Sequence, residues 1–272
     1  MTAGGIIRAI QRVGQRAKPT YQALVTAINE SPMVVPDETG WRENGQSRWE
    51  WVFATPATTV YLITKGRGFA DASLVLPADY AGTIVRDGWV AYREYDRARH
   101  QSCLGHLLHR CDTLTTDHPH SAFAPAVQAI LQAGLAARDR WRARQISDHG
   151  AAVIRGQLVH QLDLVLDAPG PLADMRRFAR HLDREFRHLF TFLTDLDLDA
   201  TNYRAEQAIR PSVAIRKVCG GNRSPLGIET QYLLSSLLRT AVQRNVDIPA
   251  TITTLLRSPV PIVPAGLRAP PC

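Results

Sequence analysis

The sequence lacks any apolar run long enough to cross a bilayer. Its longest weakly polar stretch, residues 124–137, covers 14 positions and contains two glutamines, whereas a membrane-spanning helix needs about 20 apolar residues. The N-terminus also lacks the apolar segment of a secretory signal peptide. We therefore expect a cytoplasmic protein with no membrane partner.

Cysteine is scarce, and no internal repeat is visible. The chain of 272 residues has four cysteines, too few and too irregularly spaced for a disulfide framework, which suits a reducing compartment. Hydrophobic residues make up 45% and charged residues 21% of the chain. These values are ordinary for a globular protein and exclude collagen-like, coiled-coil and disordered chains. The length allows one large domain or two modest ones.

Acidic residues are outnumbered. The 32 Lys and Arg residues exceed the 25 Asp and Glu residues by seven, and arginine dominates the positive side. Residues 201–244 alone hold seven basic and two acidic side chains. Because the guanidinium fork matches phosphate geometry, this distribution favours a nucleic-acid partner, although a merely soluble basic protein is the alternative.

Strand-like runs occupy the first third of the chain, and helical patterns occupy most of the rest. Strands are expected at 33–35, 49–53, 59–64 and 83–85, the middle two forming a hairpin around Pro56. Helices are expected over 5–30 with a break at Pro19, briefly within 69–80, and over about 104–195 with breaks near Pro119, Gly150 and 169–171. This order predicts an α/β fold: a mixed sheet interrupted by a helical insertion of roughly 80 to 90 residues.

Two of the predicted strands run into an aspartate. Asp37 follows Val34-Val35-Pro36, and Asp87 follows Ile84-Val85-Arg86. Side chains at the ends of adjacent strands converge, which is where α/β sheets place their sites. Each aspartate is also compatible with a plain turn or loop. Because proline lacks a ladder donor, the first strand is expected to end or bulge at Pro36.

A third acidic residue, Glu206, lies on a predicted short helix. The helix is expected to start near residues 199–202 and to end at Arg210, before Pro211. Glu206 and Arg210 are then four residues apart on one face, so a surface ion pair is the alternative to a functional role.

Four ordered motifs carry a family resemblance. They are Asp-Glu-Thr-Gly-Trp at 37–41, Asp-Gly-Trp-Val-Ala-Tyr at 87–92, Cys-Leu-Gly-His-Leu-Leu-His-Arg at 103–110 and Asn-Tyr-Arg-Ala-Glu-Gln-Ala-Ile-Arg-Pro at 202–211, followed by Arg216-Lys217. Together they closely resemble bacterial transposases of the insertion-sequence 66 family, over roughly residues 20–245. Because longer relatives carry N-terminal DNA-binding and coiled-coil segments, residues 1–31 would be the remnant of a longer N-terminal region.

The resemblance implies a ribonuclease-H-like fold with a catalytic, metal-binding triad of Asp37, Asp87 and Glu206. Three carboxylates suit Mg²⁺ or Mn²⁺, and a pair of ions assists phosphodiester attack. The implied activity is DNA strand cleavage and strand transfer at insertion-sequence ends, in the bacterial cytoplasm at the nucleoid. Implied partners are double-stranded DNA at transposon ends and target, a second copy of the chain as a homodimer on DNA, and other proteins encoded by the same element.

Basic residues after Glu206 are candidates for DNA contact. Arg210, Arg216, Lys217 and Arg223 follow it, and residues 213–215 alternate as if extended, so we expect these side chains to bind phosphates. A solvated basic face is the alternative. His106 is a further candidate for contact with the scissile phosphate or a base, or is structural.

A zinc site is the alternative for a Cys and His cluster, formed by Cys103, His106, His109 and Cys111. Apolar residues between them predict the start of an amphipathic helix instead, on which such side chains cannot close a tetrahedron.

The expected domain organisation follows from these assignments. It comprises N-terminal helices at 1–31, the first part of the core at 32–110, the helical insertion at 111–198, the Glu-bearing and C-terminal helices at 199–257, and a Pro-rich tail at 258–272. Two other functions stay open: a structure-selective nuclease of the same fold, and a non-catalytic DNA-binding fragment of a transposase.

Overall fold

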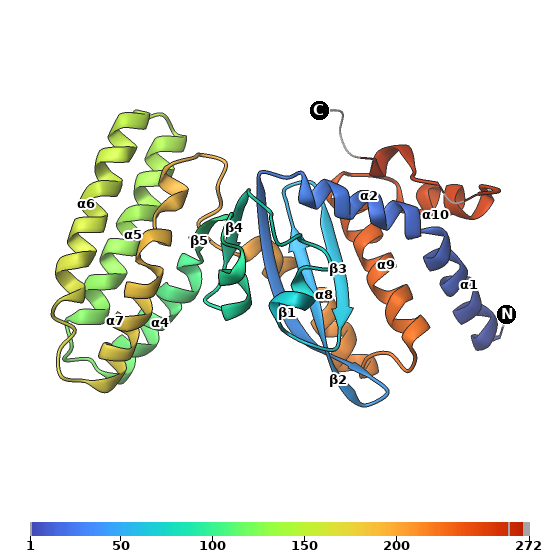
Figure 1. The fold of residues 1–272 in the computed structure, drawn as a ribbon, viewed down its shortest axis with the longest axis horizontal. Helices are drawn as coiled ribbons and strands as arrows, with labels where there is room; N and C mark the ends of the chain where they lie inside the picture. Colours follow the sequence, from blue (N-terminus) through green and yellow to red (C-terminus); the bar gives the residue numbers. More distant parts are fainter. Residues whose placement is uncertain (1, 261, 269–272) are drawn as a thin grey trace. The chain divides into compact units, whose positions relative to one another are not determined.

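The computed structural model describes residues 2–260 and 262–268 of the chain (Figure 1). The chain divides into two compact units. Unit 1 comprises Met1–Gly82, Val90–Ala98 and Tyr203–Cys272, and unit 2 comprises Thr83–Trp89 and Arg99–Asn202. Each unit is described by itself.

Unit 1 contains three antiparallel strands. They are β1 (Met33–Glu43), β2 (Gln46–Ala54) and β3 (Thr59–Thr64). The predicted β2–β3 hairpin is present, with Phe53 paired to Val60. The β1–β2 hairpin was not predicted, although Asn44 and Gly45 both have positive φ angles of 47° and 79°, and Asn-Gly is the strongest short hairpin signal.

The first strand does not end at Asp37. β1 continues through Pro36, which pairs with Phe53, and stays in register with β2 as far as Glu43 opposite Gln46. The expectation that Pro36 stops or bulges the strand is wrong, because one missing N–H removes a single bond from a long and otherwise continuous ladder. Asp37 therefore lies within a strand and not after one.

Helices from both ends of the chain complete unit 1. They are α1 (Ala3–Arg16), α2 (Lys18–Asn29), the short α3 (Phe69–Ala72), α8 (Tyr203–Cys219), α9 (Pro225–Gln243) and α10 (Ile248–Arg257), with 3-10 turns at Val90–Glu94 and Ala265–Leu267. The break between the first two helices falls at Ala17, and Pro19 occupies the first turn of α2, where its missing N–H costs nothing. Of the predicted tail, residues 261 and 269–272 lie outside the described part.

The helix that carries Glu206 is longer than predicted. α8 runs on through Pro211 to Cys219, so the expectation of a helix end at Arg210 and an extended segment at 213–215 is wrong. A proline inside a helix costs one hydrogen bond and crowds the carbonyl four residues earlier. Packing of α8 on β1 and β2 supplies the compensating contacts.

Hydroxyl side chains of α9 cover the free edge of β3. The Thr240 hydroxyl donates to the Thr59 carbonyl and accepts from the Thr59 N–H, both at 3.1 Å, and the Ser236 hydroxyl accepts from the Tyr61 N–H at 2.9 Å. These bonds satisfy main-chain groups that an edge strand otherwise exposes for pairing with another chain.

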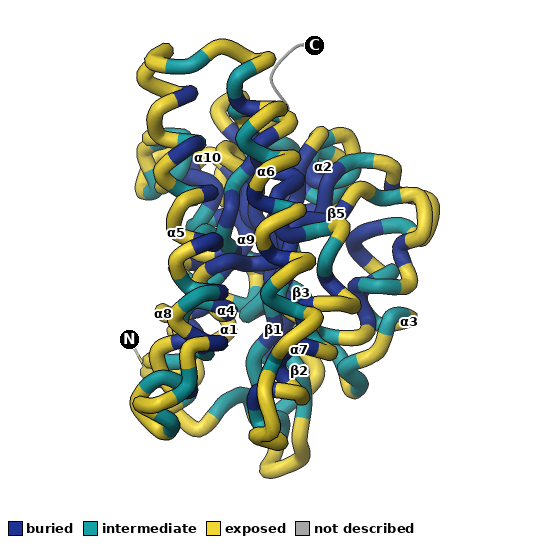
Figure 2. The backbone as a smooth tube through the Cα atoms, turned by 90° about the vertical axis from the view of Figure 1, so that its left-hand side faces the viewer, coloured by how far each residue is buried: buried dark blue, intermediate teal, exposed yellow. Residues whose placement is uncertain are grey.

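Unit 2 contains two parallel strands, four α-helices and 3-10 turns at Phe186–His188 and Thr191–Leu193. The strands and α-helices are β4 (Thr83–Arg86), β5 (Arg99–Ser102), α4 (Leu104–Asp117), α5 (Phe123–Arg142), α6 (Asp148–Leu166) and α7 (Ala173–Glu185). The predicted breaks near Pro119 and 169–171 are present, and the one expected near Gly150 falls at residues 143–147, with Gly150 itself inside α6. Figure 2 shows long exposed stretches along α6, which is therefore the least buried of these helices.

The fold class agrees with the sequence prediction at the level of a mixed α/β protein. Unit 1 holds antiparallel strands in the order β3-β2-β1, unit 2 holds the parallel pair β4–β5, and helices follow in both. This arrangement is consistent with a ribonuclease-H-like fold. None of the described helices is long and apolar enough to cross a bilayer.

A fully buried ion pair joins α7 to the last residue of β4. The Arg86 guanidinium lies 2.8 Å from the Glu185 carboxylate, and their side chains are 2% and 1% exposed. The Ser102 hydroxyl donates to the same carboxylate at 2.6 Å. Arg86 also donates to the carbonyl of Asp87 at 3.0 Å, so the pair stabilises the main chain on which Asp87 sits.

We expect Glu185→Ala to destabilise the protein by about 3–5 kcal/mol, because it leaves a buried guanidinium without its counter-charge. The double change Arg86→Met with Glu185→Leu should recover most of this loss. Thermal or urea unfolding followed by circular dichroism measures both. Asp139→Ala is the control, because its ion pair with Arg138 is 3.4 Å long and Asp139 is 69% exposed. A Glu185→Ala cost as small as that of the control would contradict the prediction.

Candidate active site

Side-chain alternation places Asp37 on a defined face of the unit 1 sheet. Asp37, Thr39 and Trp41 share one face of β1, since successive side chains point to opposite sides. The Arg216 guanidinium of α8 donates to the Thr39 hydroxyl at 3.3 Å, and the Trp41 indole N–H donates to Asn222, just after α8, at 2.8 Å. The shared face is therefore the one that α8 covers.

One hydrogen bond sets how far along the sheet α8 lies. Asp37 pairs with Val52, and Val52 pairs with Tyr61, so the three side chains form a row across the sheet. The Tyr61 hydroxyl donates to the carbonyl of Ala208 on α8 at 2.6 Å. Glu206 precedes Ala208 by two residues, about 3 Å along the helix axis. Tyr61, which shares this row with Asp37, therefore anchors α8 two residues after Glu206.

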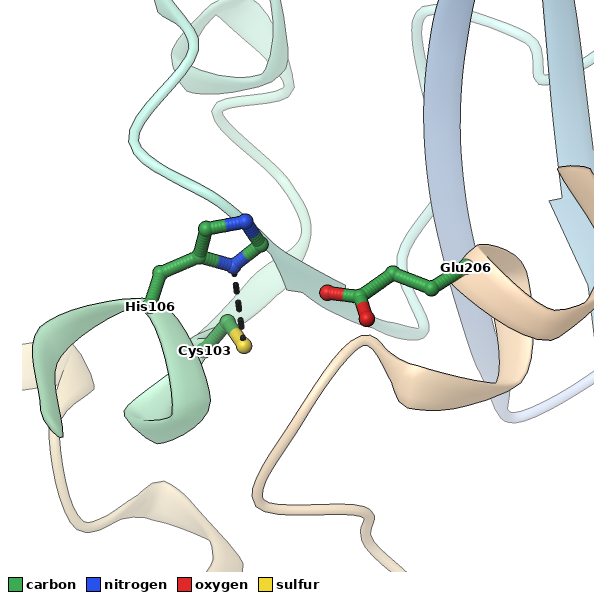
Figure 3. A group of neighbouring side chains, drawn as sticks. All are labelled: Cys103, His106 and Glu206. Carbon is green, nitrogen blue, oxygen red and sulfur yellow. Dashed lines mark hydrogen bonds between the residues drawn. The ribbon is translucent and has the colours of Figure 1, made fainter. Parts of the chain in front are cut away.

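The two carboxylates are partly accessible. Asp37 and Glu206 are both half-buried, and Asp37 Oδ1 accepts a hydrogen bond from the Glu38 N–H at 2.9 Å. Glu206 lies beside the sheet-facing residues Ala205, Ala208 and Ile209, which are buried. Figure 3 shows its side chain extended from the start of α8.

Glu38, which follows Asp37, lies on the opposite face of β1 and binds structural partners there. Glu38 is buried, and it accepts bonds from Arg67 Nε at 2.9 Å and Nη2 at 2.5 Å and from the Tyr92 hydroxyl. Arg67 also lies 4.6 Å over the ring of Trp49. This charge is therefore neutralised by structural partners, and of the two adjacent acids only Asp37 faces α8.

A second buried acid, Glu50, was missed by the sequence analysis. It pairs across the strands with Thr39, on the face that α8 covers, and is fully buried. Neither carboxylate oxygen has a hydrogen-bond partner among the described residues. Burial raises the pKa of Glu50 to about 7, and the nearby Ser212 hydroxyl and Arg216 guanidinium limit the rise. In the sequence, the burial of Glu50 was indicated only by its position within the alternating strand pattern at 49–53.

In unit 2, Asp87 follows β4 directly, as predicted. It is half-buried, and its Oδ1 accepts from the Trp89 N–H at 2.8 Å, so turn chemistry is also present. A Cβ at Gly88 would lie 2.8 Å from Cε1 of His181 on α7. A larger residue at position 88 would therefore require the His181 ring to move.

Cys103 and His106 lie at the start of α4. His106 Nδ1 is 3.3 Å from Cys103 Sγ (Figure 3), and the same sulfur accepts from the Asn202 N–H at 3.3 Å. Cys103 is buried and His106 is exposed. His109 is exposed, whereas Cys111 is fully buried, where burial raises the pKa of its thiol to about 12. The four residues point to different environments, so the zinc alternative is not supported.

The predicted DNA-binding arginines and lysine differ in their surroundings. Arg210, Lys217 and Arg223 are exposed. Arg216 is half-buried and donates to the Gly40 carbonyl in addition to Thr39, so it holds α8 on β1. A role for these four residues and for His106 in DNA binding stays a prediction.

The family model described as Transposase IS66 family matches residues 1–230. The chain belongs to the IS66 transposase family. Comparison with curated proteins and with solved structures found no match. Membership confirms the resemblance carried by the four motifs. It implies the activity of a DDE transposase domain, with divalent metal ions and DNA as partners.

The titration of Glu50 predicts a pH-dependent stability. A carboxyl pKa raised from 4.5 to about 7 stabilises the folded protein below pH 4.5, and this stabilisation is lost as the pH rises to 7, because the unfolded chain ionises first. We expect Glu50→Gln to remove this loss, making the variant more stable than the parent at pH 8 by on the order of 2–3 kcal/mol.

Unfolding midpoints between pH 4.5 and 8 measure this difference. The exposed Glu30→Gln change is the control and should leave the pH profile unchanged. A Glu50→Gln profile parallel to that of the parent would show that Glu50 ionises normally in the folded chain.

Proposed function

We propose that this chain is the catalytic domain of an IS66-family transposase, which cleaves DNA strands and transfers them to target DNA. Asp37, Asp87 and Glu206 are its catalytic and metal-binding carboxylates. The observation that carries the proposal is in unit 1, where Tyr61, in the row of Asp37, anchors α8 two residues after Glu206, and Arg216 anchors it on β1. Asp87 joins the set because its motif, Asp-Gly-Trp-Val-Ala-Tyr at 87–92, resembles that of the family.

The donor set fits hard divalent ions. All three side chains offer carboxylate oxygens, which Mg²⁺ and Mn²⁺ prefer over sulfur or imidazole ligands. A bound pair of ions would supply an activated oxygen nucleophile and stabilise the leaving oxygen. Asp37 and Asp87 each accept a main-chain N–H through Oδ1, and these bonds restrict the rotation of the carboxylates before any ligand arrives.

The residues around the proposed site position α8 and neutralise a nearby acidic charge. Arg216 holds α8 against β1, while Arg67 and Tyr92 neutralise Glu38 on the far face. Exposed Arg210, Lys217 and Arg223 supply positive charge on and after α8 for the phosphate backbone. His106 is exposed at the start of α4 and offers a hydrogen bond to DNA. We expect the active form to be a homodimer on double-stranded DNA.

We expect Asp37→Asn, Asp87→Asn and Glu206→Gln each to reduce strand cleavage and joining to the uncatalysed background. Each change preserves shape and removes one ligand charge. DNA affinity should stay the same or rise slightly, since a negative charge near phosphates is lost. The assays are nicking of supercoiled plasmid and joining of labelled 3′ ends, with Mg²⁺ or Mn²⁺, alongside binding to duplex DNA. Asp139→Asn is an exposed control expected to retain parental activity.

The outcomes separate the competing functions. Nicking without joining by the parent chain would indicate a structure-selective nuclease. DNA binding without cleavage under either ion would indicate a non-catalytic transposase fragment. Near-parental cleavage by any one of the three purified variants would remove that residue from the triad.

A further inference from the structure

Helix α1 carries a row of arginines at four-residue spacing. Arg8, Arg12 and Arg16 lie on one helix face, since four residues correspond to just over one turn. They line a groove of about 810 Å³ with Gln11, and Leu226 of α9 and Leu256 of α10 form its other wall. No acidic side chain occurs on α1. The groove lies wholly within unit 1.

Two of these arginines have no ion-pair partner. Glu229 on α9 is already held by Lys18 at 2.7 Å and by Gln15 at 2.8 Å, and the Lys18 bond lowers the pKa of that carboxyl. Arg16 donates to the Ser258 carbonyl. Arg8 and Arg12 are exposed and make no ion pair or side-chain hydrogen bond within the described part of the chain. Their charge is therefore available to a partner.

We propose that this face of α1 is a contact surface for the phosphate backbone of double-stranded DNA. Arg8 and Arg12 are about 6 Å apart along the helix axis, so each can reach a different phosphate of one strand. A guanidinium donates two parallel bonds to a phosphate and is more weakly hydrated than an ammonium. The proposal rests on the proposed function, which supplies DNA as the partner, and adds a binding surface far along the chain from Glu206.

The surface is continuous with the end of α8. Gln11 also lines a second groove of about 350 Å³, which reaches Ile215 on α8 and Asn222 just after it. Arg223 is exposed and directly follows Asn222. One duplex lying along unit 1 would therefore meet positive charge from α1 and from the segment that follows α8. Such a track gives a role to the arginines of a helix that contributes only Val13 and Gly14 as buried residues.

The test is the salt dependence of DNA binding by the double variant Arg8→Gln with Arg12→Gln, in metal-free buffer. Each phosphate contact contributes about 0.9 to the slope of log affinity against log salt concentration. We expect the slope to fall by about two and the affinity at 0.1 M salt to fall about tenfold to fiftyfold. The probe is a fluorescent duplex of arbitrary sequence, and binding is followed by anisotropy.

The matched control is Arg176→Gln with Arg180→Gln on α7. These two arginines are also exposed and four residues apart, so the net charge changes equally, but α7, unlike α1, also carries Asp174, Asp183 and Glu185. The control should keep the parental slope. An equal fall of the salt-dependence slope in both double variants would show a general charge effect and overturn the proposal.

Three further outcomes are decisive. An unchanged slope in the Arg8 and Arg12 variant, with normal binding by the parent chain, would overturn this surface and leave the proposed function intact. Loss of binding to anionic phospholipid vesicles without any change in the DNA slope would assign the face to a membrane surface instead. Failure of the parent chain to bind duplex DNA would overturn the proposed function itself.

Discussion

The packing of α8 on the β1–β2–β3 face is the constraint on which the site in unit 1 depends. The helix is held at two levels, by the Tyr61 hydroxyl on the Ala208 carbonyl and by Arg216 on Thr39 and Gly40. Two anchors fix both its position along the strands and its rotation. Glu206 lies two residues before the first anchor point on α8 and ten residues before the second.

The tyrosine anchor also explains how α8 tolerates Pro211. The proline removes the N–H that would bond the Gln207 carbonyl, and the Tyr61 hydroxyl donates to the very next carbonyl, that of Ala208. A helix weakened at this point is thus held to the sheet where its own hydrogen bonding is poorest. Local propensity predicts an end at Arg210, and tertiary packing overrides it.

The motifs were readable from the sequence, whereas several boundaries around them were not. Asp87 is where an apolar strand meets a turn, and the sequence shows both features. Pro36 predicted an early end of β1. The strand continues because β2 pairs with it on both sides of Pro36, and this pairing cannot be read from the residues of β1 alone. β5 consists of Arg-His-Gln-Ser, which has no strand signature. It forms a buried strand because His100, Gln101 and Ser102 make hydrogen bonds to other parts of unit 2.

The buried acids on the two faces of the β1–β2 pair differ in their hydrogen bonding. Glu38 receives an arginine and a tyrosine and is fully satisfied, while Glu50 has neither carboxylate oxygen bonded within the described residues. Burying an unbonded carboxylate is expensive, and the group avoids the cost by staying protonated near neutrality. No property of the isolated sequence distinguishes these two glutamates, because the difference lies in what faces them from α8 and from residues 67 and 92.

The ion pair between Arg86 and Glu185 has a consequence for biosynthesis. The ribosome finishes β4 long before it makes α7, and at about 5–20 residues per second the intervening hundred or so residues take about 5–20 s to add. Until then the nascent strand carries a guanidinium without its carboxylate, and Gly88 lacks the histidine that packs against it. The main chain of Asp87 is therefore fixed late, so a prematurely terminated product lacking α7 cannot hold this carboxylate in its final place.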